Sequence, residues 1–202
     1  KPIKVCDAVP LAISKKTRKL VLMSATLSEF DVKDLGFTHK RVKFLDVASG
    51  IPVENRPVFV RPCLSNRSVT GYQDAGMVLE ALKKVAARMP TDKGIVHTTY
   101  DMARCLKALI ASEGYSDLAD KMMFHDKFNK RQVLAEFMAC KEPRILVACG
   151  MTEGVDFKGD LARFQIIAKI AWPSLIDPVY QRLAEESPDA YAWIAARMVM
   201  QA

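Results

Sequence analysis

Short apolar runs alternate regularly along this chain with segments of helical periodicity. The runs at residues 94–98, 144–149 and 164–170 have the length and side-chain type of buried strands. Strands that alternate with helices along a chain form parallel sheets covered on both faces. The sequence therefore predicts an α/β fold with a mostly parallel sheet and helices on both faces.

The predicted helices lie between and after these runs. Residues 74–89 place apolar side chains at helical spacing, with Asp74 at the N-cap position. Four further helices are expected at 101–112, 129–140, 178–186 and 188–200. The remaining expected elements are strands at 4–8, 18–23 and 121–124, and a helix with a turn at 29–38.

Residues 42–60 interrupt this alternation. They contain Gly50, Pro52 and Pro57, which disfavour regular structure. The segment suits a connector between two domains, and we place the boundary near Arg61.

A candidate ligand loop follows the run at 144–149. It reads Met-Thr-Glu-Gly-Val-Asp-Phe at 151–157, so two carboxylates and a flexible glycine stand where a strand reaches the surface. Ligands collect at the carboxyl ends of strands in open α/β sheets, and glycine lets backbone amides approach a phosphate or ribose. The alternative is a solvated turn in which Glu153 and Asp156 serve only as polar caps.

A second candidate is Ser24-Ala25-Thr26, which follows the apolar residues 19–23. The simple interpretation is a turn whose hydroxyls satisfy backbone amides or cap the next helix. The order and separation of this block and the 151–157 loop are, however, similar to those of two motifs of superfamily 2 helicases.

Two downstream blocks make the resemblance more specific. Residues 164–173 end in Trp-Pro and lead to Asp177-Pro178 and Arg182-Leu183, which resembles the XPD/DinG branch of that superfamily. Residues 94–100 are similar to the fourth motif of the branch, a strand that ends in small polar residues and a tyrosine. The resemblance extends from about Lys19 to the last residue. It implies a RecA-like fold of the P-loop NTPase type.

In that reading, residues 1–60 are the end of a first RecA-like lobe plus a linker, and residues 61–202 are most of a second lobe. Residues 198–202 resemble the opening of the sixth motif, whose arginines are absent. The sequence also lacks a Gly-x-x-x-x-Gly-Lys-Ser/Thr loop and an Asp-Glu-x-His box, which would hold phosphate and magnesium. We therefore expect that the isolated chain does not hydrolyse ATP.

The resemblance also implies roles for individual residues. The family uses ATP and Mg²⁺, the ion being held mainly by the first lobe, and moves 5′ to 3′ on DNA. The catalytic candidates on the nucleotide side are Glu153, Gly154, Asp156 and Gln201. The candidates for coupling nucleotide binding to strand movement are Ser24, Ala25 and Thr26.

The candidates for contacting single-stranded DNA are Thr98, Thr99, Tyr100, Thr152 and Lys158. They are expected at the ends of successive strands, where hydroxyls and amides meet phosphates and a tyrosine ring meets a base. For Tyr100 the alternative is a half-buried aromatic at the start of a helix. RNA as the bound strand stays open.

Charge and cysteine content agree with this class of protein. The net charge is +7 and the pI about 9.2, which favours an acidic partner, although a solvated basic face would give the same values. The five cysteines form no Cys-x-x-Cys pair and are read as free core thiols, and the three histidines show no metal-ligand spacing, so no metal site is predicted.

The sequence also bears on the cellular location of the protein and on a possible iron–sulfur cluster. No apolar run reaches the roughly 20 residues that cross a bilayer, and the chain shows no signal peptide, so a cytoplasmic location is expected. Some members of the resembled branch carry an iron–sulfur cluster on an insertion in the first lobe. That question stays open.

Two other classes of function remain. A nucleic-acid-binding or protein-binding module without motor activity would keep the sheet and the charge but would not need Asp156. A small-molecule α/β enzyme would need a glycine-rich phosphate loop after its first strand, and the sequence contains none.

Overall fold

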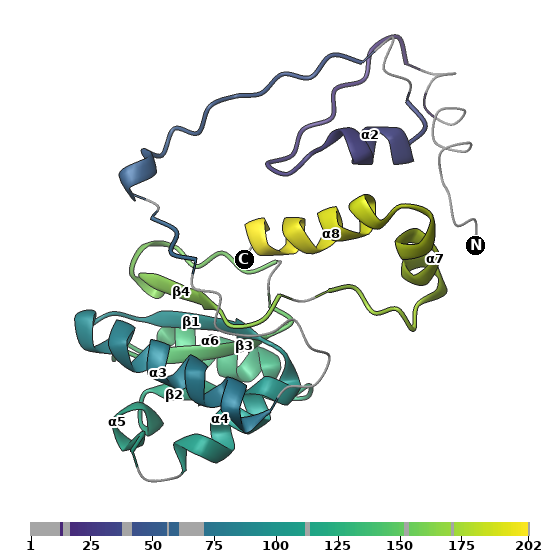
Figure 1. The fold of residues 1–202 in the computed structure, drawn as a ribbon. Coiled ribbons are helices and arrows are strands. Elements are labelled where there is room, and N and C mark those ends of the chain that lie inside the picture. The colour runs from purple at the N-terminus through teal and green to yellow at the C-terminus, as the bar shows by residue number, and fades with distance from the viewer. Residues whose placement is uncertain are drawn as a thin grey trace. The chain divides into compact units, whose positions relative to one another are not determined.

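Figure 1 shows the computed structural model, which describes residues 13, 17–37, 42–55, 57–60, 71–111, 114–151, 154–170 and 172–201. The chain divides into two compact units. Unit 1 comprises residues 1–60 and 173–193, and unit 2 comprises residues 61–172 and 194–202.

Unit 2 is built on a parallel sheet of four strands. The strands are β1 (Gly94–Thr98), β2 (Met122–Phe124), β3 (Ile145–Cys149) and β4 (Phe164–Ile167). Their spatial order is β2-β3-β1-β4, so the two longest strands lie in the middle. The predicted α/β fold with a parallel sheet is confirmed.

Helices cover both faces of this sheet (Figure 1). On one face Val96 and Val147 pack against α3 (Tyr72–Arg88) and α4 (Tyr100–Ile110). On the other face Ile95 and Leu146 pack against α6 (Lys130–Ala139). Because both faces of each central strand are buried, their sequences are continuously apolar instead of alternating.

Several helix boundaries differ from the prediction by one or two residues. Helix α3 begins at Tyr72 after Gly71, so the prediction of Asp74 as N-cap was wrong. Asp74 instead lies in the first turn, where a carboxylate interacts favourably with the helix dipole. Helix α4 begins at Tyr100, one residue earlier than expected, because the Thr99 hydroxyl accepts a hydrogen bond from the backbone N–H of Met102. The four-residue helix α5 (Ser116–Ala119) was not predicted.

The start of β1 is fixed by two close contacts. A Cβ atom on Gly94 would lie 2.1 Å from the ring of Phe164, so the aromatic ring of β4 packs directly over the glycine backbone. The Lys93 ammonium group is buried, donates to the carbonyl oxygens of Phe137 and Cys140, and lies 4.7 Å from the centroid of the Phe137 ring. Lys93 thereby satisfies carbonyl groups at the end of α6 that the helix itself leaves unpaired.

Unit 1 contains short helices. Helix α2 (Glu29–Asp34) has a capping box in which Ser28 and Asp31 each bond the backbone N–H of the other. A 3-10 helix, η2, spans Val53–Asn55. Helix α7 (Pro178–Glu186) is capped by Asp177, whose side chain accepts from the N–H of Val179 at 2.9 Å. Helix α8 (Pro188–Gln201) has its first residues in unit 1 and its last in unit 2.

The predicted strand at 18–23 was wrong. These residues are described and form no strand, and the side chains of Val21 and Met23 are 78% and 89% exposed. An apolar run becomes a strand only when a neighbouring strand bonds its backbone, and the described part of the chain offers this run none. The predicted strand at 4–8 lies outside the described residues. The predicted irregularity of 42–60 is confirmed where it is described, apart from η2.

The structure also bears on the expected free cysteines and on membrane-spanning segments. Cys105, Cys140 and Cys149 are free thiols, whereas Cys6 and Cys63 lie outside the described residues. None of the helices in the described ranges is long and apolar enough to cross a membrane.

Candidate functional site

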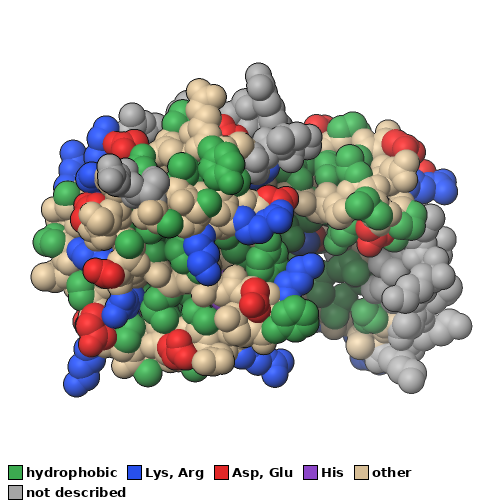
Figure 2. All heavy atoms as spheres, turned by 90° about the horizontal axis from the view of Figure 1, so that it is seen from below, with side chains coloured by type: hydrophobic (Ala, Val, Ile, Leu, Met, Phe, Trp, Pro, Cys, Tyr) green, Lys and Arg blue, Asp and Glu red, His purple; other side chains and the backbone are tan. Residues whose placement is uncertain are grey.

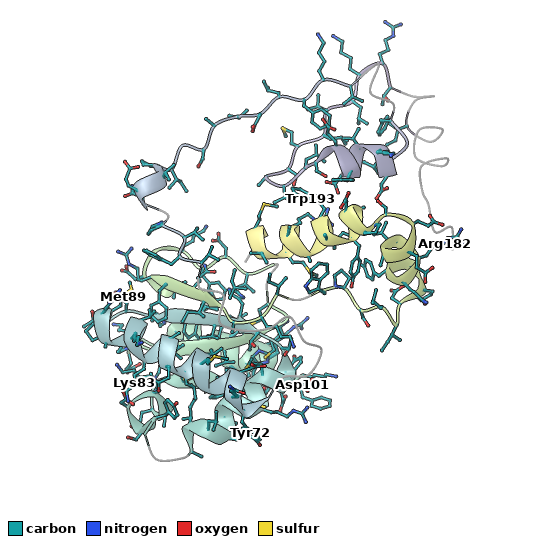
Figure 3. The ribbon with its side chains drawn as sticks, viewed as in Figure 1. Tyr72, Lys83, Met89, Asp101, Arg182 and Trp193 are labelled. Atoms are coloured by element: carbon teal, nitrogen blue, oxygen red, sulfur yellow. The ribbon has the colours of Figure 1, made fainter. Side chains whose placement is uncertain are left out.

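The carboxyl ends of the sheet strands bring two of the predicted segments together. Thr98 pairs with Cys149 in the register of β1 and β3, so the segments that follow both strands leave the sheet at the same edge. Phe124 pairs with Val147, which brings His125 to this edge as well. In Figure 3, Met89 at the end of α3 and Asp101 near the start of α4 mark opposite ends of the sheet. The carboxyl edge is the end near Asp101.

The loop after β3 is anchored on both sides of its candidate residues. Met151 is only 2% exposed, and the Phe157 ring packs edge-on against Phe137 of α6 with 6.1 Å between ring centroids. Between these anchors Gly154 is exposed, has a left-handed φ of +78°, and would meet nothing within 4 Å if it carried a Cβ atom. The anchors hold the loop at the sheet edge, and Gly154 between them faces open space. Thr152 and Glu153 lie outside the described residues.

Asp156 and Lys158 lie on the exposed part of this loop. The Asp156 carboxylate and the Lys158 ammonium group are 3.2 Å apart, and their side chains are 72% and 82% exposed. An exposed ion pair of this kind contributes only about 0–1 kcal/mol to stability. Both side chains can therefore exchange their mutual contact for a ligand at small cost.

At the end of β1, the three predicted strand-binding residues have different surroundings. The Thr98 hydroxyl is buried and has no hydrogen-bond partner among the described residues. The Thr99 hydroxyl caps α4, with 3.4 Å to the N atom of Met102. A hydroxyl that accepts one hydrogen bond still has a proton to donate, so capping leaves Thr99 able to contact a phosphate.

Tyr100 is a half-buried aromatic at the start of α4. Its ring packs edge-on against His125 at 5.7 Å, and the Lys127 ammonium group lies 5.9 Å from its centroid. Burial raises the pKa of its phenol, with a further contribution from Cys149 and Asp126, so the group stays a neutral donor. These surroundings match the helix-start alternative, and base stacking by Tyr100 stays a prediction.

His125 joins the ends of β2 and β3, which the sequence analysis did not foresee. Its Nε2 accepts the backbone N–H of Cys149 at 3.0 Å, and its Nδ1 lies 2.9 Å from the carbonyl oxygen of Asp126. Because a carbonyl oxygen can only accept, the geometry assigns Nδ1 as the donor and Nε2 as the acceptor. The signal for His125 was its position directly after a predicted strand.

Two other titratable groups at this edge have physical reasons to stay inert. Burial raises the pKa of the Cys149 thiol to about 11, against a smaller opposing effect of Lys130, so this thiol is not a nucleophile. Burial also lowers the pKa of His97, whose Nε2 lies 3.2 Å from Gln165 Oε1. Among the residues that the structure describes, no group of three or more His, Cys, Asp or Glu side chains could hold a metal ion.

Residues 24–26 form a turn in unit 1 in which Ser24 and Ala25 are exposed and Thr26 is partly buried. The N–H of Thr26 donates to the Ser24 hydroxyl at 3.2 Å, which is the local bonding of a simple turn. Gly154 and Asp156 belong to unit 2, so the convergence of Ser24, Ala25 and Thr26 with the loop stays a prediction. Gln201 ends α8, and its side chain lies outside what the structure describes.

Comparison with known proteins identifies the protein family to which this chain belongs. Residues 82–202 match the family described as Helicase C-terminal domain, a region that contains the sheet, the Thr98–Tyr100 segment and the loop after β3. The chain belongs to this family, and its second unit is a RecA-like α/β domain of a superfamily 2 helicase. No curated protein matches the sequence.

Proposed function

We propose that this chain is the C-terminal motor lobe of an ATP-dependent helicase of the XPD/DinG type that moves 5′ to 3′ on single-stranded DNA. The observation that carries the proposal is the loop after β3. Met151 and Phe157 anchor it, Gly154 and Asp156 are exposed between the anchors, and it leaves the carboxyl edge of the sheet within the matched region.

The residues present suit part of a nucleotide and not a metal ion. The open side of Gly154 lets backbone groups come close to a ligand, and the exposed Asp156 carboxylate is an acceptor for a ribose hydroxyl. Mg²⁺ prefers several oxygen ligands, and the described acidic residues form no such cluster. When bound, ATP supplies the phosphoanhydride bond whose cleavage drives movement. Glu153 and Gln201 join the nucleotide side of this proposal.

The proposed strand path follows the same edge of the sheet. Thr99 offers a hydroxyl, and Lys158 offers a charge on the loop after β3. Thr98 belongs to the same set of candidates, but its hydroxyl is buried, so it would contact a strand only after the end of β1 rearranges. Tyr100 and Thr152 complete the set of strand-binding candidates.

The nucleotide role is tested by Asp156→Ala in the intact parent protein. We expect ATP turnover to fall by at least tenfold with the melting temperature unchanged, because the carboxylate is exposed and its ion pair is weak. Asp160→Ala is the matched control, since Asp160 is 98% exposed, lies in the next turn and pairs with Arg163. Equal turnover in the Asp156 and Asp160 variants would contradict the proposal.

The coupling role is tested by replacing Ser24 and Thr26 with Ala together. We expect ATP turnover to persist while strand unwinding falls. Ser49→Ala is the matched control, because its hydroxyl accepts the N–H of Ile51 at 3.2 Å, the same local bond that Ser24 makes with Thr26. Unwinding that survives in the double variant would remove the coupling assignment.

A third measurement separates a motor from a binding module without motor activity. Single-strand binding by the intact protein is compared with and without ATP, in the parent sequence and in Asp156→Ala. A motor changes its affinity for the strand with nucleotide, and the variant loses that response. A module shows the same affinity in all four measurements.

A further inference from the structure

Phe128 is almost fully exposed to solvent, although its side chain is hydrophobic. It lies in the loop between β2 and α6, and its side chain is 98% exposed. This loop follows His125, so it leaves the carboxyl edge of the sheet beside Tyr100 and Cys149. The aromatic ring is therefore presented at the edge where the nucleic-acid candidates lie.

The loop that carries Phe128 is held by its own hydrogen bonds. One carboxylate oxygen of Asp126 accepts the N–H groups of Phe128 at 2.7 Å and of Asn129 at 2.9 Å. The side-chain oxygen of Asn129 accepts the N–H of Asp126 at 2.8 Å. The N–H groups of Asn129 and Phe128 lower the pKa of Asp126, so its carboxylate stays charged and keeps these bonds. The outward direction of Phe128 is thus set by the backbone.

The residues that flank Phe128 in the sequence are mostly cationic. Lys127 precedes it and lies over the Tyr100 ring, and Lys130 donates to the carbonyl oxygen of Gly150. Arg131 follows one residue later and is exposed. The one acidic side chain between residues 125 and 131, Asp126, is occupied by backbone N–H groups. Lys and Arg are otherwise scattered among acidic and apolar side chains on the face in Figure 2, so local groupings carry more information than net charge.

We propose that Phe128 stacks on a base of the bound single strand, with Lys127 and Arg131 beside the adjoining phosphates. Proteins bind single-stranded nucleic acid with this combination of an exposed aromatic face and flanking cations. Charge complementarity favours a polyanion, because protein-docking aromatics lie in interface centres that are depleted of charged residues. The proposal rests on the proposed function, since it needs the chain to bind a single strand.

The test is binding of the 202-residue chain to a fluorescent oligothymidine, followed by anisotropy at several salt concentrations. A stacked base contributes about 1–3 kcal/mol, so Phe128→Ala should weaken binding by about 5- to 150-fold. Phe128→Trp should keep or strengthen binding. Phe59→Ala is the matched control, because Phe59 is 90% exposed in unit 1 and should leave the affinity unchanged.

The two basic residues are tested by the salt dependence. Lys127→Ala and Arg131→Ala should each lower the slope of log affinity against log salt by about 0.7, the value expected for one lost contact to a single strand. Phe128→Ala should leave that slope unchanged.

The outcomes separate this inference from the proposed function. If the unaltered chain fails to bind the oligonucleotide, both are overturned. If it binds, and Phe128→Ala binds equally well, the inference alone is overturned and Phe128 is left for a protein contact. Equal losses in Phe128→Ala and Phe59→Ala would also overturn it, because a stacked ring is specific to one position.

Discussion

Strand β3 and residues 20–23, which form no helix or strand, have similar apolar sequences and opposite surroundings. Ile145–Cys149 is buried throughout, with the side chains of Leu146 and Val147 fully enclosed. Leu20, Val21 and Met23 are 43%, 78% and 89% exposed. The first run has β1 and β2 as neighbours, whereas the second pairs with no strand in the described part of the chain.

The difference shows that apolar composition alone does not create a strand. An edge-free, doubly covered position satisfies the backbone of β3 and removes its side chains from water at the same time. Residues 20–23 gain neither benefit. Exposed groups of large apolar side chains usually mark surfaces that contact another element or protein. Four experiments test how far burial separates the two units, and their predicted effects decrease in the order given.

Leu146→Ala should destabilise unit 2 by about 2–5 kcal/mol, because it removes a fully buried side chain and leaves a cavity between the sheet and α6. Leu45→Ala, at a side chain in unit 1 that is 88% exposed, should change stability by less than about 0.5 kcal/mol. Urea denaturation followed by circular dichroism measures both. A similar cost at both positions would show that residues 42–49 are packed in solution.

Gly94→Ala should destabilise by about 1–3 kcal/mol, because the new methyl group overlaps the Phe164 ring and forces the start of β1 and β4 apart. Gly76→Ala is the control in the same unit. Gly76 lies within α3 with open space around it, so alanine there should stabilise by about 0.5–1 kcal/mol. Opposite signs in thermal melts are expected, and two stabilising substitutions would refute the close packing.

Lys93→Met keeps the length of the side chain and removes its charge. We expect a loss of about 1–2 kcal/mol, since the carbonyl group of Cys140 loses its ammonium donor and that of Phe137 keeps only the weak thiol donor of Cys140. Lys84→Met, at an exposed position of α3, is the control and should be nearly neutral. If Lys93→Met stabilised the protein, desolvation of the ammonium group would outweigh its hydrogen bonds.

The smallest effect concerns pH. Burial lowers the pKa of His97 below its ordinary value of 6.5, so the unfolded chain takes up a proton more readily than the folded one. This contribution to stability is complete above pH 6.5 and is lost as the pH falls from 6.5 through the lowered pKa. Urea midpoints between pH 7.5 and 5 measure the loss. His97→Gln should reduce the slope, and an equal slope would assign it to other groups.

The central strands were predictable because their boundaries are set locally. β1 was expected at 94–98 and is found there. All five of its residues are buried, and the residues on either side define where the strand begins and ends. β4 ends at Ile167 instead of residue 170, and residues 18–23 form no strand. Those errors share a cause, because the length of a strand depends on how far its neighbour pairs with it, which the strand's own sequence does not contain.

The candidate site was predictable to a similar degree. The position of the loop after β3 follows from strand order and chain direction, so the sequence was sufficient to place Gly154 and Asp156 at the sheet edge. The hydrogen bond from Cys149 to His125 joins residues 24 positions apart, and it depends on β2 pairing with β3. The exposure of Phe128 likewise required the loop conformation, because a phenylalanine in a sequence is expected to be buried.

Because the Lys93 amine is buried, its chemical labelling can report when α6 separates from the sheet. Amine-reactive reagents need an unprotonated, accessible nitrogen, whereas this one is held against two carbonyl groups and a ring beneath α6. Labelling at residue 93 therefore requires α6 to separate from the sheet, while the exposed lysines react at once. The rate of that slow modification, read by peptide mass spectrometry, would time the opening of the domain without any introduced probe.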